Sequence, residues 1–206
     1  MSTTGITSER NLRVLLANED EDALARFGDV LQTLGHEVTP YAVSVREAVE
    51  IIAREDPDLT IVVVHHDDEH GLALISETVE YASGPVIAHV RGAEDPDLIA
   101  RAAEMGISAY LDSSEPAAVQ AAIEVALRRH REATRLEAKV EELQTALERR
   151  AVIERAKGIL MERHAIGDRE AFERLRDHAR AHHRRVVDVA QAVLEGHPLL
   201  PRLAGR

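Results

Sequence analysis

The densest group of metal-ligating side chains in the 206-residue sequence is HHDDEH, at residues 65–70. Imidazole and carboxylate groups are ligands for Zn²⁺ and other divalent ions, and His89 is a further candidate nearby. A loop need not bring such side chains together, so a polar loop at a strand end is the simpler interpretation. We therefore predict no metal and no other cofactor, and keep His65, His66 and His70 as candidate ligands.

Charged residues of the C-terminal part could bind an anion. Residues 126–206 carry 18 Lys and Arg against 13 Asp and Glu, whereas residues 1–125 carry 7 against 24. A basic segment attached to an acidic one attracts anionic partners, although helices rich in Arg and Glu can simply have solvated faces. His178 and His182 have the spacing of metal ligands on a helix, but no third ligand is evident.

Composition excludes several classes of protein. The chain has no Cys, which rules out disulfides and thiolate metal sites. The polar N-terminus has no features of a signal peptide, and apolar runs such as residues 59–64 are too short to cross a bilayer. We therefore expect a cytoplasmic protein without a membrane-spanning segment.

The elements that must position these groups alternate over the first 125 residues. The expected strands cover residues 12–17, 36–41, 59–64, 85–90 and 108–111, and the expected helices 22–34, 45–54, 73–81 and 96–105. Such alternation predicts an α/β fold with a doubly wound, five-stranded parallel sheet. Functional residues of such sheets lie at the carboxyl ends of the strands.

A long helical pattern follows, from Pro116 without Gly or Pro to Gly158. Leu136, Val140, Leu143 and Leu147 are spaced by four, three and four residues, the a/d spacing of a coiled coil over about two heptads. This is either a plain connecting helix or a seam along which two chains pair. We favour the seam, and hence a homodimer.

The apolar residues of the segment 150–194 recur at helical spacing and predict three short helices. The core of so small a unit is too thin for an enzyme. Gly167 is expected to adopt the left-handed conformation that ends the first helix, with Asp168 capping the next. A softer break is expected at His182 and His183. Phe172 is expected in the core.

The N-terminal elements, with Pro57 before the third strand and Gly71 after it, resemble the receiver domain of two-component response regulators over about residues 11–130. The resemblance implies an acidic pair that holds Mg²⁺, a phosphorylated Asp, a hydroxyl and a Lys at successive strand ends. Here those positions are occupied by Asn18 and Glu19, Val63, Val90 and Ser113. Because valine cannot accept a phosphoryl group, we expect a degenerate receiver controlled without phosphorylation, through an unknown regulatory protein or ligand.

The segment 143–194 closely resembles the ANTAR domain, the RNA-binding module of bacterial transcription antitermination regulators. The matching residues are AKGILM at 156–161, Ala171-Phe172 with Leu175-Arg176, and Val189-Ala190. The resemblance implies binding of RNA stem-loops, usually paired hairpins, and phosphate contacts need cations on one face. The residues expected at the RNA are Arg149, Arg150, Lys157, Gly158, Arg176, Arg180, Arg184 and Arg185. A glycine inside a helix costs about 1 kcal/mol, so Gly158 indicates close approach of another helix or of the RNA backbone.

These observations predict a non-enzymatic, dimeric RNA-binding regulator of transcription antitermination. The alternatives are an adaptor that binds another protein, and a signalling scaffold that responds to a metal or ligand. The expected division is a disordered tail at 1–10, a receiver-like domain at 11–117, a coiled-coil linker helix at 118–148, an ANTAR domain at 149–196 and a loose tail at 197–206.

Overall fold

The structure is a computed structural model that describes residues 11–18, 20–39, 41–64, 69–90 and 96–196. The chain divides into two compact units, residues 1–134 and residues 135–206. The strands are β1 (Arg13–Ala17), β2 (Glu37–Val38), β3 (Leu59–Val64), β4 (Val86–Val90) and β5 (Ala109–Leu111). The helices are α1 (Glu21–Thr33), α2 (Val45–Glu55), α3 (Glu69–Tyr81), α4 (Pro96–Glu104), α5 (Pro116–His164), α6 (Asp168–Ala181) and α7 (Val186–Leu194). The expected tails at 1–10 and 197–206 lie outside the described residues.

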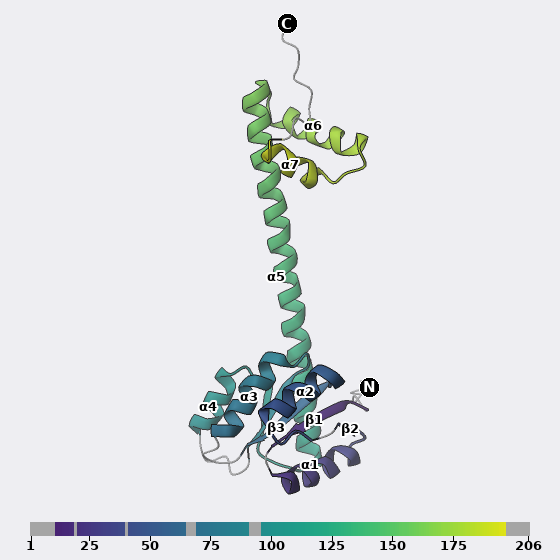
Figure 1. Ribbon diagram of the computed structural model, residues 1–206, viewed down its shortest axis with the longest axis vertical. Helices are drawn as coiled ribbons and strands as arrows, with labels where there is room; N and C mark the ends of the chain where they lie inside the picture. Colours follow the sequence, from purple (N-terminus) through teal and green to yellow (C-terminus); the bar gives the residue numbers. More distant parts are fainter. Residues whose placement is uncertain (1–10, 19, 40, 65–68, 91–95, 197–206) are drawn as a thin grey trace, which may run out of the picture. The chain divides into compact units, whose positions relative to one another are not determined.

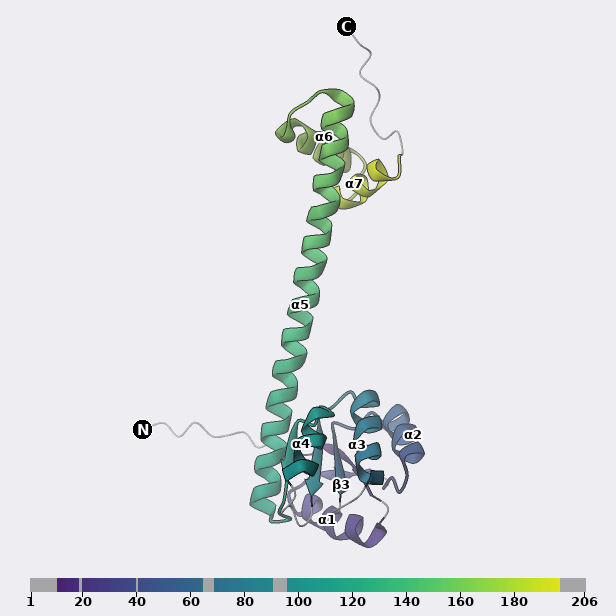
Figure 2. The same cartoon turned by 90° about the vertical axis from the view of Figure 1, so that its left-hand side faces the viewer.

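The first unit is a parallel sheet with strand order β2-β1-β3-β4-β5. Helices α2, α3 and α4 pack against one face, and α1 with the first turns of α5 against the other. β3 lies in the middle of the sheet (Figures 1 and 2), and all its residues are buried because both faces are covered. The predicted doubly wound α/β fold is confirmed.

The predicted second strand, 36–41, is longer than the one observed. Regular pairing with β1 is confined to Glu37 and Val38, and an isolated bridge between Ala17 and Ala42 follows. β2 is one of the two edge strands of the sheet. Because β2 forms backbone hydrogen bonds with one neighbouring strand only, its length is less constrained than that of β3, which has a strand on each side.

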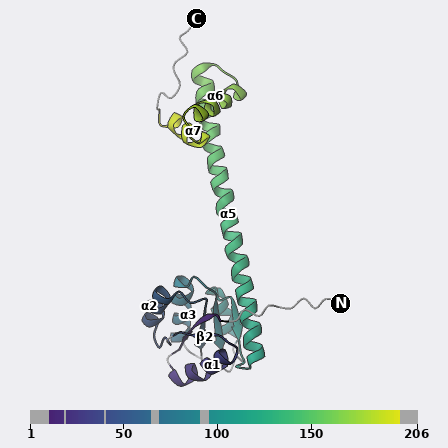
Figure 3. The same cartoon turned by 90° about the vertical axis from the view of Figure 1, so that its right-hand side faces the viewer.

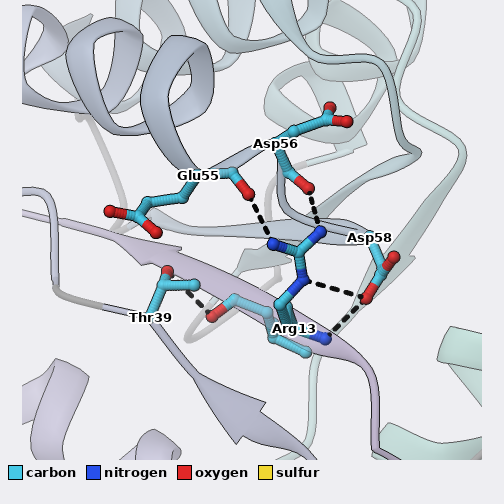
Figure 4. Close-up of polar contacts among 6 residues, drawn as sticks. Arg13, Thr39, Glu55, Asp56 and Asp58 are labelled. Atoms are coloured by element: carbon cyan, nitrogen blue, oxygen red, sulfur yellow. Dashed lines mark hydrogen bonds and ion pairs between the residues drawn. The ribbon is translucent and has the colours of Figure 1, made fainter.

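Arg13 fastens the amino end of β1 to the turn between α2 and β3 (Figure 4). Its guanidinium donates hydrogen bonds to the carbonyl oxygens of Glu55 and Asp56, at 2.7 and 2.8 Å. Its backbone N–H donates to Asp58 Oδ2 at 2.8 Å. Asp56 has φ 45°, so the cation satisfies carbonyls at the left-handed end of α2.

α5 is one continuous helix of 49 residues. The prediction of three short helices for residues 150–194 is therefore wrong for the first of them, which is the end of this long helix. In the second unit α6 and α7 pack beside α5 (Figure 3). The core they share contains Ala156 and Leu160 from α5, Leu175 from α6 and Val189 from α7.

The turn between α5 and α6 differs from the prediction. The left-handed residue is Ala165, with φ 51°, while Gly167 is extended, with φ −80° and ψ 165°. Gly167, and not Asp168, occupies the N-cap position, and no side-chain hydrogen bond caps α6. The carboxylate of Asp168 instead pairs with Lys157 of α5. The second break is confirmed at His183, which has φ 53°.

Candidate functional site

The carboxyl ends of β3 and β4 place Val63 beside His89, because the two residues pair in the sheet register. Between them and α1 lies a cavity of about 130 Å³. The described residues that line it are Ala23, Arg26, Phe27, Val63, His89 and Ser114. The phosphoacceptor position is thus occupied by a buried aliphatic side chain, which has no oxygen for a phosphoryl group.

Two of the predicted pocket positions lie elsewhere. Val90 is one residue beyond His89, so alternation along the strand turns it to the opposite face, where it packs in the core with α2, α3 and α4. Ser113 Oγ accepts a hydrogen bond from the Glu115 backbone N–H, at 3.1 Å. The resemblance to receiver domains did not identify Ser114 as a lining residue, and the alternation of side chains along β4 is the pattern that identifies His89.

The side-chain amide of Asn18 forms hydrogen bonds with two backbone groups of the protein. Its side-chain nitrogen donates to the Val63 carbonyl oxygen, and its Oδ1 accepts from the Asp20 backbone N–H at 2.6 Å. The side chain is buried and joins the ends of β1 and β3, so the amide acts as a structural link. The other half of the expected acidic pair, Glu19, lies outside the described residues.

The three candidate metal ligands lie in or beside the segment 65–68, which is outside the described residues. His65 and His66 lie outside the described residues, and His70 is described only as part of α3, without its side chain. Within the described ranges no three His, Asp or Glu side chains are arranged to hold a metal ion. His89, the further candidate, lies at the cavity, with Nε2 at 3.3 Å from Ser114 Oγ.

Lys157 does not present a free cation in the second unit. Its side chain is 9% exposed, and its Nζ lies 2.6 Å from Asp168 Oδ1 and 2.8 Å from Glu154 Oε2. The ammonium donates hydrogen bonds to the carboxylates of Asp168 and Glu154, and these bonds, the one to Asp168 most, raise the pKa of Lys157. The residue links α5 to the first residue of α6.

The other expected RNA ligands separate into paired and unpaired cations. Arg185 makes two hydrogen bonds to the carboxylate of Asp188, at 2.9 and 3.0 Å, which lowers the pKa of Asp188. Arg176 Nε lies 3.5 Å from Asp177. Arg149, Arg150, Arg180 and Arg184 are exposed and make no ion pair with a described residue. Arg180 and Arg184 flank the turn between α6 and α7.

Two further positions differ from expectation. Phe172, expected in the core, is 39% exposed, because Ala171 and Leu175 take the buried face of α6. Gly158 lies in α5, and no described atom comes within 4 Å of where its Cβ would be. No helix of the described chain therefore packs closely against this glycine.

The predicted seam residues are the most exposed large aliphatic side chains of α5. Leu136, Val140, Leu143 and Leu147 are each more than half exposed. They share one stripe of the helix by their spacing.

Two histidine rings lie against each other at the end of α6. The centroids of His178 and His182 lie 4.3 Å apart. Burial first, and then the charges of His182 and Arg184, lower the pKa of His178 below the ordinary histidine value. The folded chain therefore takes up this proton less readily than the unfolded chain. The stabilisation is complete above the ordinary histidine pKa and is lost as pH falls through it toward the lowered value.

We expect the second unit to unfold at a lower temperature at about pH 5 than at about pH 7. A His178→Gln variant should show a weaker dependence, measured by thermal unfolding followed by circular dichroism. His183→Gln, at an exposed position in the turn, is the matched control and should keep the wild-type dependence. Identical pH profiles for His178→Gln and wild type would contradict the assignment.

Searching the described helices for a long apolar stretch able to cross a membrane gives none.

Comparison with known proteins assigns both parts of the chain. The ANTAR domain matches residues 141–194. The transcriptional regulatory protein PdtaR, from two Mycobacterium tuberculosis strains (CDC 1551 / Oshkosh and ATCC 25618 / H37Rv), is 32% identical over 186 residues, which cover 89% of this chain and 89% of each relative. The name of this relative describes a regulator.

Solved structures match the first unit. The signal receiver domain of a modulated diguanylate cyclase from Desulfovibrio desulfuricans G20 has a TM-score of 0.52 at 20% identity, covering 59% of this chain and 97% of that one. A LuxR-family two-component response regulator from Aurantimonas sp. SI85-9A1 has a TM-score of 0.51 at 19% identity, covering 57% and 86%. At these identities the similarity shows a receiver fold alone.

Proposed function

Because the chain belongs to the PdtaR-like transcriptional regulators that carry an ANTAR domain, we propose that residues 149–196 bind RNA stem-loops and so control transcription antitermination. The observation that carries the proposal is the pair of exposed, unpaired arginines at the turn between α6 and α7, Arg180 and Arg184. The carbonyl end of α6 lies here, and cations there are favourable both to the helix and to phosphate.

Arginines would contact the phosphates of the RNA, and one aromatic ring would stack on a base. Guanidinium groups contact phosphates and can stack on bases. The exposed ring of Phe172 adds an aromatic surface, and stacking of a base on such a ring contributes about 1–3 kcal/mol. Lys157, which is buried, and Arg185, which is exposed, would stabilise this surface, since both are held by carboxylates.

A second chain would cover the seam of α5. The stripe Leu136, Val140, Leu143 and Leu147 gives a homodimer with two RNA-binding units, which suits paired hairpins. Gly158 lies eleven residues after Leu147, about three turns of helix and hence within about 20° of the same stripe. The close helix packing that this glycine indicates, and that its own chain does not supply, is then supplied by the partner.

The receiver-like unit would act without phosphorylation. Val63 offers no acceptor oxygen, and Asn18 binds the backbone of β3 where a receiver needs a metal ligand. Regulation would therefore come from a change in dimerisation or from binding at this unit.

The test is the binding of a two-hairpin RNA at several salt concentrations, with Arg180→Glu and Arg184→Glu beside wild type. Each variant should weaken binding and lower the slope of log affinity against log salt by about 1 or more. Arg169→Glu is the matched control, because Arg169 is equally cationic on α6 but already pairs with Glu173 at 3.1 Å. Absence of wild-type binding at low salt, or equal losses in all three variants, would sink the proposal and favour a protein partner.

A further inference from the structure

The cavity beside Val63 has walls of two kinds. Ala23, Phe27 and Val63 supply apolar surface, and the Phe27 ring lies 4.7 Å from the His89 ring, centroid to centroid. Arg26, His89 and Ser114 supply polar groups. An empty cavity lined only by apolar groups needs no ligand, but a mixed lining at the functional edge of the sheet resembles a small-molecule site.

The polar groups favour an anion. Arg26 is a permanent cation, the Ser114 hydroxyl can donate a hydrogen bond, and the two lie in the same lining. The described lining residues include one cation and no carboxylate. Among the described residues Arg26 pairs with Asp20, at 4.0 Å between two half-exposed side chains, and the other oxygen of Asp20 already caps α1.

The volume restricts the ligand to a few atoms. A cavity of about 150 Å³ in another protein accommodates benzene, so a cavity of about 130 Å³ holds a molecule of similar or smaller size. The apolar walls favour a short hydrocarbon tail over a fully hydrated dianion such as phosphate. The site suits a small organic monoanion that has one charged end and one apolar end.

We propose that this cavity binds a short-chain monocarboxylate, of the size of acetate to butyrate. The carboxylate lies between Arg26 and Ser114, and the hydrocarbon tail contacts Phe27 and Val63. Loss of the phosphoacceptor aspartate makes this possible, because a second carboxylate at position 63 would repel the ligand. The first unit then senses a small metabolite in place of phosphorylation, and this binding does not depend on RNA.

The experiment titrates the full-length protein with propionate and follows the backbone amide signals of residues 63, 89 and 114 by NMR. Wild type should show saturable shifts at these three positions. Arg26→Gln should weaken binding by about tenfold or more, since a hydrogen bond to a charged group is lost. Arg46→Gln is the control, because Arg46 is exposed on α2 and pairs only with Glu50 in the described structure. It should bind as wild type does.

Two further ligands test whether the cavity recognises both the negative charge and the hydrocarbon tail. Propylamine has the same tail and the opposite charge, and inorganic phosphate has the charge without the tail, so neither should shift these signals at the concentration at which propionate saturates. Equal responses to propionate and propylamine, or tighter binding of phosphate, would overturn the proposal. So would the absence of saturable binding, or an unchanged affinity in an Arg26→Gln variant that gives the wild-type spectrum without ligand. The RNA experiment is separate, so failure here leaves it intact.

Discussion

A Leu143→Glu variant is expected to be monomeric at concentrations at which the wild-type chain is dimeric, and to lose about a hundredfold or more in affinity for a two-hairpin RNA. Leu143 lies in the middle of the stripe formed by Leu136, Val140 and Leu147, and all four side chains are exposed in the single chain. Burying one leucine contributes about 1.5–3 kcal/mol. The substitution removes that contribution and places two carboxylates against each other across the pair of helices.

Sedimentation equilibrium measures the oligomeric state, and titration with one-hairpin and two-hairpin RNAs measures the affinity. Ala138→Glu is the matched control, because it adds the same charge at an exposed position of α5. Ala138 lies nine residues from Leu147, which places it on the opposite side of the helix. The monomeric Leu143→Glu variant should still bind a single hairpin as wild type does. A wild-type chain that is monomeric when it binds RNA, or equal effects of the two substitutions, would contradict a dimer along this stripe.

Sequence patterns predicted best the elements whose residues are buried on both sides. The bounds of β3 agree with prediction, because a run of β-branched residues buried on both faces has few alternatives. The length of β2 was overestimated. An edge strand has a single neighbouring strand, so its sequence alone does not fix where the pairing ends. The length of α5 was underestimated because Gly158 weakens the helical pattern, although one glycine costs too little to end a helix that is packed on either side of it.

Side-chain roles were less predictable than elements, because they depend on contacts between segments distant in sequence. The alignment of β4 reached the correct strand, but the parity of pairing with β3 decides that His89, and not Val90, faces the cavity. The pairing of Lys157 with Asp168 joins two helices across a turn whose left-handed residue is an alanine, which sequence rules do not favour. Exposure of Phe172 depends on which residues of α6 face α5.

Lys157 either links α5 to α6 or contacts RNA phosphate, and one substitution distinguishes the two roles. If it links α5 to α6, Lys157→Met should lower the unfolding temperature of the second unit by several degrees, because the carboxylate partners lose their cation while the apolar stem is retained. If it contacts phosphate, the variant should keep its stability and lose about one unit of the salt slope of RNA binding. The geometry, with two carboxylates at 2.6 and 2.8 Å, favours the first outcome.

A double-mutant cycle measures the coupling between Lys157 and Asp168. Asp168→Asn should destabilise the second unit in the same direction, and adding it to Lys157→Met should cost less than the two single effects together. Because the pKa of Lys157 is raised in the folded chain, the stabilisation is complete below the ordinary lysine pKa and is lost as pH rises through the raised value. Lys157→Met should abolish this alkaline loss, and additive effects of the two substitutions would show that the ion pair does not hold α6 to α5.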